Sequence, residues 1–241
     1  MPTTTTTTRK PRAKKIETVV ATTPAVVEAP APKELTREDL RIGIAYPFFM
    51  GSFARFYPGI RVVEDPTDVV NFDLIVFAGG EDLSPSMYGE ENTMSFEPNA
   101  KRDAIESEIF KACRTAGVHV YGSCRGHQLI NVLCGGSLHQ DIFSSGNRHG
   151  NTHELNWEQN SMVGDMFSDG VNSLHHQGIH NLGKDLYTLA SFNGIPEVIY
   201  GKKMFGTQFH PELMRTQGAI DFFNLLLDWV LSDKKKEASA S

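Results

Sequence analysis

One cysteine stands in a setting that favours reactivity. Cys124 occupies the middle of the stretch GSCRG at 122–126, between an apolar run that ends at Tyr121 and a segment with helical spacing. This Gly-x-Cys-x-Gly pattern is typical of a nucleophile elbow, a tight strand-to-helix turn that holds the nucleophile in a strained conformation. The N-terminus of the helix favours the thiolate, and the backbone N–H of Arg125 can face an oxyanion. The alternative is a buried structural cysteine beside a glycine-rich turn.

A histidine and a glutamate two residues apart can complete such a site. His210, Pro211 and Glu212 follow a segment with strand character. Residues i and i+2 of an extended segment point to the same side, so the imidazole and the carboxylate can lie together. A thiol nucleophile needs an imidazole to take and return its proton, and the imidazole needs a carboxylate to orient it. The chain has nine histidines, and we expect most others, such as His149 and His153, to be surface-exposed or locally bonded.

Paired glycines form a third element. Gly79 and Gly80 follow the apolar run DLIVF at 73–77. A strand that ends in two glycines can turn a backbone N–H outward beside the elbow, which would supply a second oxyanion donor. The alternative is an ordinary tight turn, which the same pair of glycines also predicts.

The elements that must position these residues alternate between strands and helices. Apolar runs predict strands at 41–46, 73–77, 118–121, 186–191, 197–200 and 204–209, and helical spacing predicts helices at 101–116, 125–134 and 220–231. Gly117 and the pair at 135–136 are expected to end the first two helices. The alternation favours an α/β layered fold with a largely parallel sheet. Cys113 and Cys134 lie on apolar helical faces, so we expect both in the core.

Composition changes at both ends of the chain. Residues 1–35 are rich in Thr, Pro and Ala and contain a basic cluster, so we predict a disordered N-terminal tail. The alternative for the basic cluster is an address or a tether to nucleic acid or to a partner. Residues 36–233 form the predicted catalytic domain, and 234–241 a disordered C-terminal tail. Deletion of residues 1–33 is expected to leave the activity of the domain intact.

Bulk properties restrict the classes of function. The chain has 241 residues, of which 40% are hydrophobic and 22% charged, and a formal net charge of -6. The acidic balance argues against nucleic-acid binding by the folded domain. Three cysteines without regular spacing form no disulfide framework, and with no secretory leader they predict a reducing, cytoplasmic location. No apolar run approaches the roughly 20 residues that span a bilayer.

The three elements follow one another as Gly-Gly turn, cysteine elbow and His-Pro-Glu, and in this the chain resembles the class I glutamine amidotransferase family. More closely, it resembles the branch that contains γ-glutamyl-γ-aminobutyrate hydrolases, over nearly all of 41–230. The resemblance is carried by CRGHQLIN at 124–131, GGSLHQD at 135–141, GGEDLSP at 79–85 and VNSLHHQ at 171–177. It implies a flavodoxin-like three-layer α/β sandwich with a mostly parallel central sheet, and a Cys-His-Glu triad that acts through a thioester.

The resemblance also assigns roles to individual positions. It implies nucleophile Cys124, acid/base His210 and orienting Glu212, oxyanion N–H groups from Gly80 and Arg125, and substrate-binding residues Gly79, Gln128, Ser173, His175 and Gln177. For 173–177 the alternative is a polar edge strand. Compared with the hydrolase branch, the chain has short segments at 46–73, 90–103 and 141–172. In the hydrolases, insertions at these places shape the pocket. The exact substrate is therefore left open.

Three functions follow from these observations. The first is a hydrolase that cleaves the γ-glutamyl C–N bond of glutamine or of a small γ-glutamyl amine. The second is a glutaminase subunit that delivers ammonia to a separate synthase partner. The third is a non-catalytic binding protein, against which the intact triad argues. We expect a small-molecule substrate and no membrane partner. Nucleic acid is expected to bind only through the basic tail, if at all. We expect no cofactor and no metal, because the cysteines form no zinc-binding set and pairs such as His175-His176 lack a matching carboxylate set.

Overall fold

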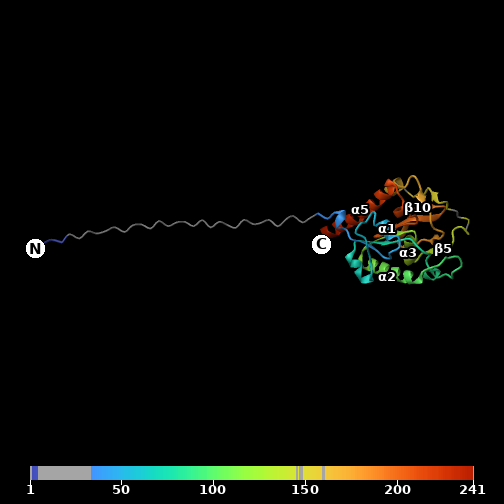
Figure 1. Ribbon diagram of the computed structural model, residues 1–241, viewed down its shortest axis with the longest axis horizontal. Helices are drawn as coiled ribbons and strands as arrows, with labels where there is room; N and C mark the ends of the chain where they lie inside the picture. The colour runs from blue at the N-terminus through green and yellow to red at the C-terminus, as the bar shows by residue number, and fades with distance from the viewer. Residues whose placement is uncertain (1, 5–33, 145, 147–148, 159–160, 241) are drawn as a thin grey trace. The chain divides into compact units, whose positions relative to one another are not determined.

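The computed structural model describes residues 2–4, 34–144, 146, 149–158 and 161–240. The chain divides into two units, Met1–Glu34 and Leu35–Ser241. The predicted N-terminal tail falls almost wholly outside the described residues, so its lack of structure stays a prediction. Every candidate site residue belongs to the second unit, and Figure 1 labels several of its helices and strands.

An eight-stranded sheet runs through the middle of the second unit (Figure 1). Its order is β2-β1-β3-β4-β12-β11-β10-β7, with bounds Arg61–Val62, Ile42–Ile44, Leu74–Phe77, His119–Ser123, Met204–Thr207, Ile195–Gly201, Leu186–Phe192 and Asn156–Trp157. The first five strands pair in parallel, and the last three join by antiparallel pairing. The six predicted strands are confirmed, with small differences at their ends. The two strands of this sheet that the sequence does not predict, β2 and β7, are too short to give an apolar run.

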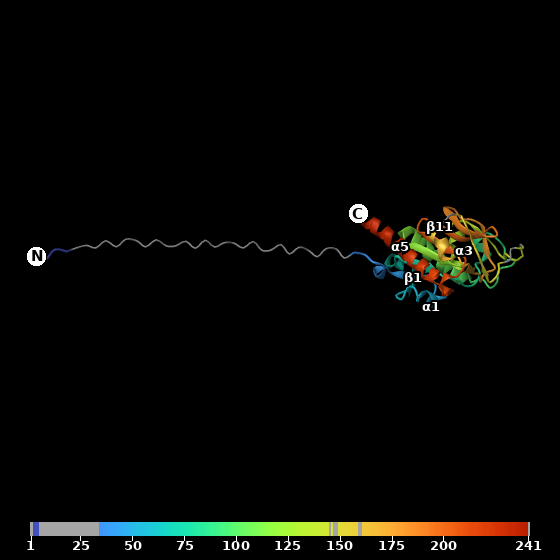
Figure 2. The ribbon, with the colours of Figure 1, turned by 90° about the horizontal axis from the view of Figure 1, so that it is seen from above.

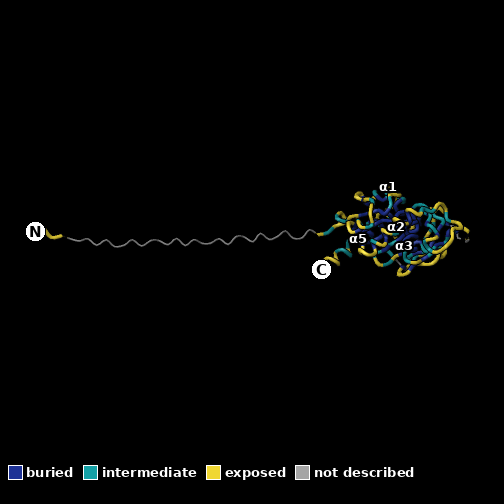
Figure 3. Tube along the Cα trace, turned by 90° about the horizontal axis from the view of Figure 1, so that it is seen from below, coloured by how far each residue is buried: buried dark blue, intermediate teal, exposed yellow. Residues whose placement is uncertain are grey.

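Helices cover both faces of this sheet (Figure 2). They are α1 (Met50–Phe53), α2 (Ala100–Ala116), α3 (Arg125–Leu133), α4 (Met162–Met166) and α5 (Gln217–Ser239). Ile75 and Phe77 of β3 pack in the core cluster that contains α2 and α3, whereas Leu74 and Val76 pack in the cluster that contains α1 and α5. Figure 3 shows the buried segments gathered inside this unit. The alternation of sides confirms the three-layer α/β sandwich with a mostly parallel sheet.

The ends of α2 and α3 agree with the sequence. Gly117 ends α2 in the left-handed conformation, with φ 69°. Helix α3 ends at Leu133, before the glycines at 135–136. Cys113 is buried in the core, as predicted, whereas Cys134 is only half-buried and packs against the core from its edge.

Short elements connect α3 to β10. Strand β5 (Ser137–His139) pairs with β9 (Gly178–Asn181), and β6 (Thr152–His153) pairs with β8 (Val171–Asn172). The described 3-10 helices are Arg37–Asp39, Pro66–Asn71, Pro85–Tyr88 and Pro211–Leu213. Residues 173–177 join β8 to β9 as a loop, so the alternative of a polar edge strand does not hold.

The C-terminal helix is longer than the sequence predicts. Helix α5 begins at Gln217 and continues to Ser239, so the predicted C-terminal tail at 234–241 is wrong for most of its length. Lys234 forms an ion pair with Asp73, just before β3, which holds the last turns to the domain. Lys, Glu and Ala are also good helix formers. Among the residues that the structure describes, no helix has both the length and the apolar character that crossing a bilayer requires.

Candidate active site

Cys124 lies at the sharp turn between β4 and α3. Its backbone has φ 51° and ψ -105°, a strained conformation for a residue with a side chain and one found at functional sites. The Cys124 N–H donates to the Thr207 carbonyl oxygen at 2.7 Å, which ties the turn to β12. A Cβ atom at Gly126 would collide with the Phe77 carbonyl oxygen, so the turn requires glycine there. This is the geometry expected of a nucleophile elbow.

His210 and Glu212 lie side by side just beyond β12. Nδ1 of His210 is 2.6 Å from Oε1 of Glu212, and the carboxylate is fully buried. Ser123, the residue before the cysteine, donates its hydroxyl to both Glu212 oxygens, at 3.0 and 2.9 Å. A carboxylate can only accept, so Nδ1 of His210 carries a proton and Nε2 is the nitrogen left for the thiol. No role for Ser123 was predicted from the sequence, although its place inside the elbow is a signal.

Three further residues fix the position of His210. Asn172 accepts from the His210 N–H through Oδ1 and donates to the His210 carbonyl through Nδ2, both at 2.8 Å. The Phe49 ring meets the imidazole edge-on, with centroids 5.4 Å apart. A Cβ atom at Gly79 would collide with Cε1 of the imidazole, so the absence of a side chain at Gly79 makes room for His210.

The electrostatics of the site favour protonated His210. Burial lowers the pKa of His210, but the negative charge of Cys124, a hydrogen bond to Cys124 and the contact with Glu212 raise it to about 10 overall. An imidazolium next to a thiolate is the arrangement that activates a cysteine, because the thiolate is the attacking form. The same imidazolium holds the proton that a leaving amine needs.

The turn after β3 is oriented by a buried arginine. Arg102 donates from Nη2 to the carbonyl oxygens of Ala78 and Gly79, both at 2.9 Å. In a trans peptide the N–H points opposite to the carbonyl of the same unit, so the Gly80 N–H points away from Arg102. Gly80 has φ 147°, and a Cβ atom there would collide with the guanidinium. This orientation suits the oxyanion donor that the sequence predicts at Gly80.

A buried charge network links both predicted oxyanion segments to α2. Nε of Arg102 donates to Glu106 at 3.1 Å, and Arg125 forms ion pairs with Asp103 and Glu106. The first N–H groups of a helix have no intrahelical partner, so the Arg125 N–H stays available at the elbow while its side chain anchors α3. This network was not predicted from the sequence. The signal that could have indicated it is the set of charges at 102, 103 and 106, which lie on one helix face. The structure buries this charged face, whereas apolar Ile105 is 36% exposed.

A cavity of about 210 Å³ opens beside Cys124. Its lining includes five of the residues that the sequence predicts, namely Gly80, Arg125, Gln128, His175 and Gln177. The structure therefore brings these five together with the thiol. Ser173, which the sequence also predicts, is buried but is not among the residues that line this cavity.

Glutamine side chains tie the cavity wall to the elbow. Nε2 of Gln128 donates to the Gln177 carbonyl oxygen and to Oε1 of Gln208, both at 3.1 Å. Nε2 of Gln208 in turn approaches Sγ of Cys124 at 3.7 Å. No role for Gln208 was predicted from the sequence. Its place in an extended segment, two residues before His210, is the signal that could have found it.

Two histidines lie where the sequence does not predict them. The side chains of His149 and His153 are 0% and 4% exposed, so the expectation that they are surface-exposed or locally bonded is wrong. They meet His175, from the loop between β8 and β9, and Glu197 of β11. The sequence gives Glu197 only a place in a strand. The structure thus provides a carboxylate next to His175 that the sequence analysis did not consider.

Comparisons with known proteins give the family. The family model described as Peptidase C26 matches residues 62–212. The glutamine amidotransferase-like protein YvdE of Lactococcus lactis is 38% identical over 161 residues, which are 58% of this chain and 66% of that protein. The gamma-glutamyl-gamma-aminobutyrate hydrolase PuuD of Escherichia coli is 27% identical over 162 residues, 57% of this chain and 63% of PuuD. The match thus spans just under two thirds of the length of both relatives.

A solved structure supports the fold. A Thermoplasma acidophilum protein described as part of a GMP synthase superposes with a TM-score of 0.65 at 16% sequence identity and covers 83% of this chain and 98% of that one. The Peptidase C26 match begins in β2 and ends at Glu212, so it includes the elbow and the His-Glu pair. The chain belongs to the Peptidase C26 family of class I glutamine amidotransferase-like amide hydrolases.

Proposed function

We propose that this chain cleaves the γ-glutamyl C–N amide bond of glutamine or of a small γ-glutamyl amine, through a thioester on Cys124. The observation that carries the proposal is the 2.6 Å contact between Nδ1 of His210 and Oε1 of Glu212, next to a thiol on a strained elbow. A cavity of about 210 Å³ beside the thiol offers room for a small-molecule substrate. The kinship with a γ-glutamyl-γ-aminobutyrate hydrolase supports the same substrate class.

The first half-reaction forms the thioester. The Cys124 thiolate attacks the γ-carbonyl carbon, and the N–H groups of Gly80 and Arg125 stabilise the oxyanion. His210 gives its proton to the nitrogen as the C–N bond breaks, so ammonia or an amine leaves. Glu212 holds the imidazole in the required tautomer throughout.

The second half-reaction releases glutamate. Neutral His210 takes a proton from water, and the hydroxide attacks the thioester carbon. The C–S bond breaks, Cys124 leaves as the thiolate, and His210 again carries the proton. No redox change occurs, and the sum is amide plus water to glutamate plus amine.

A glutaminase subunit that passes ammonia to a synthase partner is the second candidate. The segments at 46–73, 90–103 and 141–172 support it, because they are short beside the hydrolase branch, in which insertions at these places shape the pocket. The Thermoplasma acidophilum protein described as part of a GMP synthase has the same fold over 98% of its length, which is compatible with this candidate. The chemistry at Cys124 is the same in both cases, and only the fate of the nitrogen differs.

The test is glutamate release by the purified chain from L-glutamine and from a panel of γ-glutamyl amines. Cys124→Ala should abolish release, whereas Cys134→Ala, a half-buried cysteine outside the site, should keep it. Release by folded Cys124→Ala at the wild-type rate would overturn the proposal. Turnover of one γ-glutamyl amine well above glutamine identifies the hydrolase. No turnover, with Cys124 still alkylated by a glutamine-analogue electrophile, identifies the subunit that requires a partner.

A further inference from the structure

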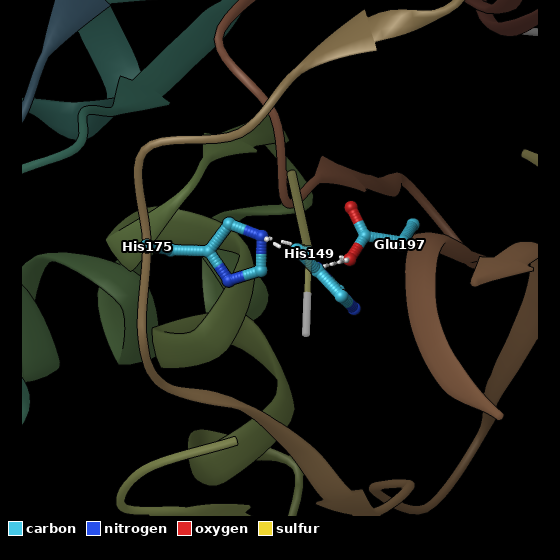
Figure 4. A group of neighbouring side chains, drawn as sticks. All are labelled: His149, His175 and Glu197. Carbon is cyan, nitrogen blue, oxygen red and sulfur yellow. Dashed lines mark hydrogen bonds and ion pairs between the residues drawn. The ribbon is translucent and has the colours of Figure 1, made fainter. Parts of the chain in front are cut away.

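Three buried side chains from separate segments converge (Figure 4), and one of them, His175, lines the active-site cavity. Nδ1 of His149 lies 3.4 Å from Nε2 of His175 and 3.4 Å from Oε1 of Glu197. Nε2 of His175 lies 3.6 Å from the same oxygen. All three side chains are at most 2% exposed. Two imidazole nitrogens and one carboxylate oxygen thus form a small triangle inside the protein.

The sides of this triangle fit the ligands of a zinc ion. Zinc in proteins is tetrahedral, with Zn–N bonds of about 2.0–2.1 Å and similar Zn–O bonds, so neighbouring ligand atoms lie about 3.3–3.4 Å apart. The three measured sides are 3.4, 3.4 and 3.6 Å. An N–H···O hydrogen bond would instead bring nitrogen and oxygen to about 2.7–3.2 Å. The two nitrogen–oxygen distances, 3.4 and 3.6 Å, are longer than such a hydrogen bond and close to the spacing of neighbouring ligands around one cation.

When it is ionised, the buried carboxylate of Glu197 needs a cation beside it. It is fully buried, and neither of its oxygens has a hydrogen-bond partner. Within the described part of the chain, its ion-pair contacts within 4 Å are with the imidazoles of His149, His153 and His175. A buried carboxylate without partners is strongly unfavourable unless it is paired with a charge or binds a metal.

The tautomer of His175 is set for metal binding. Its Nδ1 lies 2.8 Å from the Gln177 carbonyl oxygen, which can only accept, so Nδ1 carries the proton. The lone pair is therefore on Nε2, which faces His149 and Glu197. Metal-bound histidines commonly donate their other ring N–H to a backbone carbonyl in this manner.

The surroundings complete the site. His153 places Nε2 at 3.8 Å from Oε2 of Glu197, and neither of its ring nitrogens has a hydrogen-bond partner, so a fourth donor lies at the edge. The Phe192 ring packs against the imidazoles of His149 and His153, with centroids 4.7 and 4.3 Å apart, and gives the site an apolar cover. The Gln208 N–H donates to the Glu197 carbonyl at 2.7 Å, which fixes the backbone of the carboxylate.

We propose that His149, His175 and Glu197 bind one Zn²⁺ ion that holds the wall of the active-site cavity in place. Imidazole and carboxylate donors suit zinc among the common divalent ions. His175 lines the cavity that contains Cys124, and its bonded partner Gln177 lines it too. The ion would join the segment before β6, the loop after β8 and strand β11. Its role is structural, since the triad chemistry proceeds without it.

The experiment measures metal bound to the full chain. The protein is purified without added metal, analysed by elemental mass spectrometry, stripped with a chelator and titrated with Co²⁺. We expect one Co²⁺ per chain, with the visible absorption of tetrahedral cobalt, and displacement by Zn²⁺. Glu197→Gln and His149→Ala should each weaken Co²⁺ binding at least tenfold. Two variants should bind as wild type: His180→Ala, an exposed histidine outside the cluster, and Cys124→Ala, which removes the nearby thiol.

A second measurement guards against misfolded variants. Chelator should lower the Tm of wild-type protein and Zn²⁺ should restore it, because a ligand that binds only the native state stabilises it. In folded Glu197→Gln, chelator and Zn²⁺ should change the Tm little. Stripped wild-type protein that binds no Co²⁺, or Glu197→Gln protein that binds Co²⁺ as tightly as wild type, would overturn the proposal. These readouts do not depend on hydrolytic activity.

Discussion

His210 and Glu212 form one buried imidazole–carboxylate group of this protein, and His149, His175 and Glu197 form another. In the first group the nitrogen and oxygen are 2.6 Å apart, and both carboxylate oxygens accept hydrogen bonds. In the second the nitrogen–oxygen distances are 3.4 and 3.6 Å, and neither oxygen has a hydrogen-bond partner. The same residue types therefore occur once at hydrogen-bond spacing and once at ligand spacing.

The nitrogen–oxygen distances of the two groups differ by about one ångström or less, and this difference separates two kinds of chemistry. At hydrogen-bond spacing a carboxylate fixes one tautomer and stabilises the imidazolium, which suits proton transfer. At the wider spacing the donors can converge on one cation, which suits binding. The first group contacts Cys124, and Cys124 lines the same cavity as His175 of the second group. The first group is thus assigned to proton transfer and the second to the shape of the cavity wall. Each assignment can be tested by its own substitutions.

The largest effect should come from removing the imidazole of the first group. His210→Ala should lower kcat for glutamate release about 10²–10⁴-fold, because the thiol loses its base and the leaving amine its acid. A glutamate-release assay on the folded variant measures this. His180→Ala, an exposed imidazole outside both groups, is the matched control and should keep the wild-type rate. A loss of less than tenfold in folded His210→Ala protein would remove His210 from the mechanism.

The next effect should come from the carboxylate of the same group. Glu212→Gln should lower kcat about 10²-fold, because the amide orients the imidazole less well and stabilises the imidazolium less. Since the contact with Glu212 helps to raise the pKa of His210, the pH–rate profile should also move to lower pH. Glu197→Gln provides the comparison, and its profile should keep the wild-type midpoint. Equal profiles for wild type and Glu212→Gln would show that Glu212 does not tune His210.

Much of the candidate active site, namely the thiol with its turn and the first group, could be predicted from sequence because its geometry is local. Gly122 and Gly126 flank the thiol at fixed positions, and His210 and Glu212 share one side of an extended segment. The fold followed from the same kind of evidence, since the alternation of apolar runs and helical spacing requires only neighbouring residues.

The second group could not be predicted in this way, because its members lie on three separate segments. Glu197 begins a strand that the sequence predicts, and nothing near it in sequence indicates a ligand. The charges of α2 are a similar case. Glu106 pairs with Arg102 of its own helix and with Arg125 of α3, and a pattern within one helix does not identify a partner on another.

The pH dependence of stability should carry the signature of the first group. The pKa of His210 is about 10 in the folded protein, above the ordinary 6.5 of an unfolded chain. A raised pKa contributes stability that is fully present below about pH 6.5 and is lost as pH rises towards 10. The difference in unfolding free energy between wild type and His210→Asn should therefore shrink over this range. Denaturant titrations at several pH values measure it, and a difference that grows with pH would contradict the assigned shift.

The smallest effect should come from Asn172, which holds the backbone of His210 and takes no part in proton transfer. Asn172→Ala leaves the His210 N–H and carbonyl without their 2.8 Å partners, so the unfolding free energy should fall by about 1–3 kcal/mol. Exposed Asn71→Ala should change it by less than about 0.5 kcal/mol. Metal binding at the second group should be unaffected, because none of its three proposed ligands contacts Asn172 through the hydrogen bonds described. If Asn172→Ala instead lowered metal affinity while sparing kcat, the two groups would be one coupled unit and the division between chemistry and wall would fail.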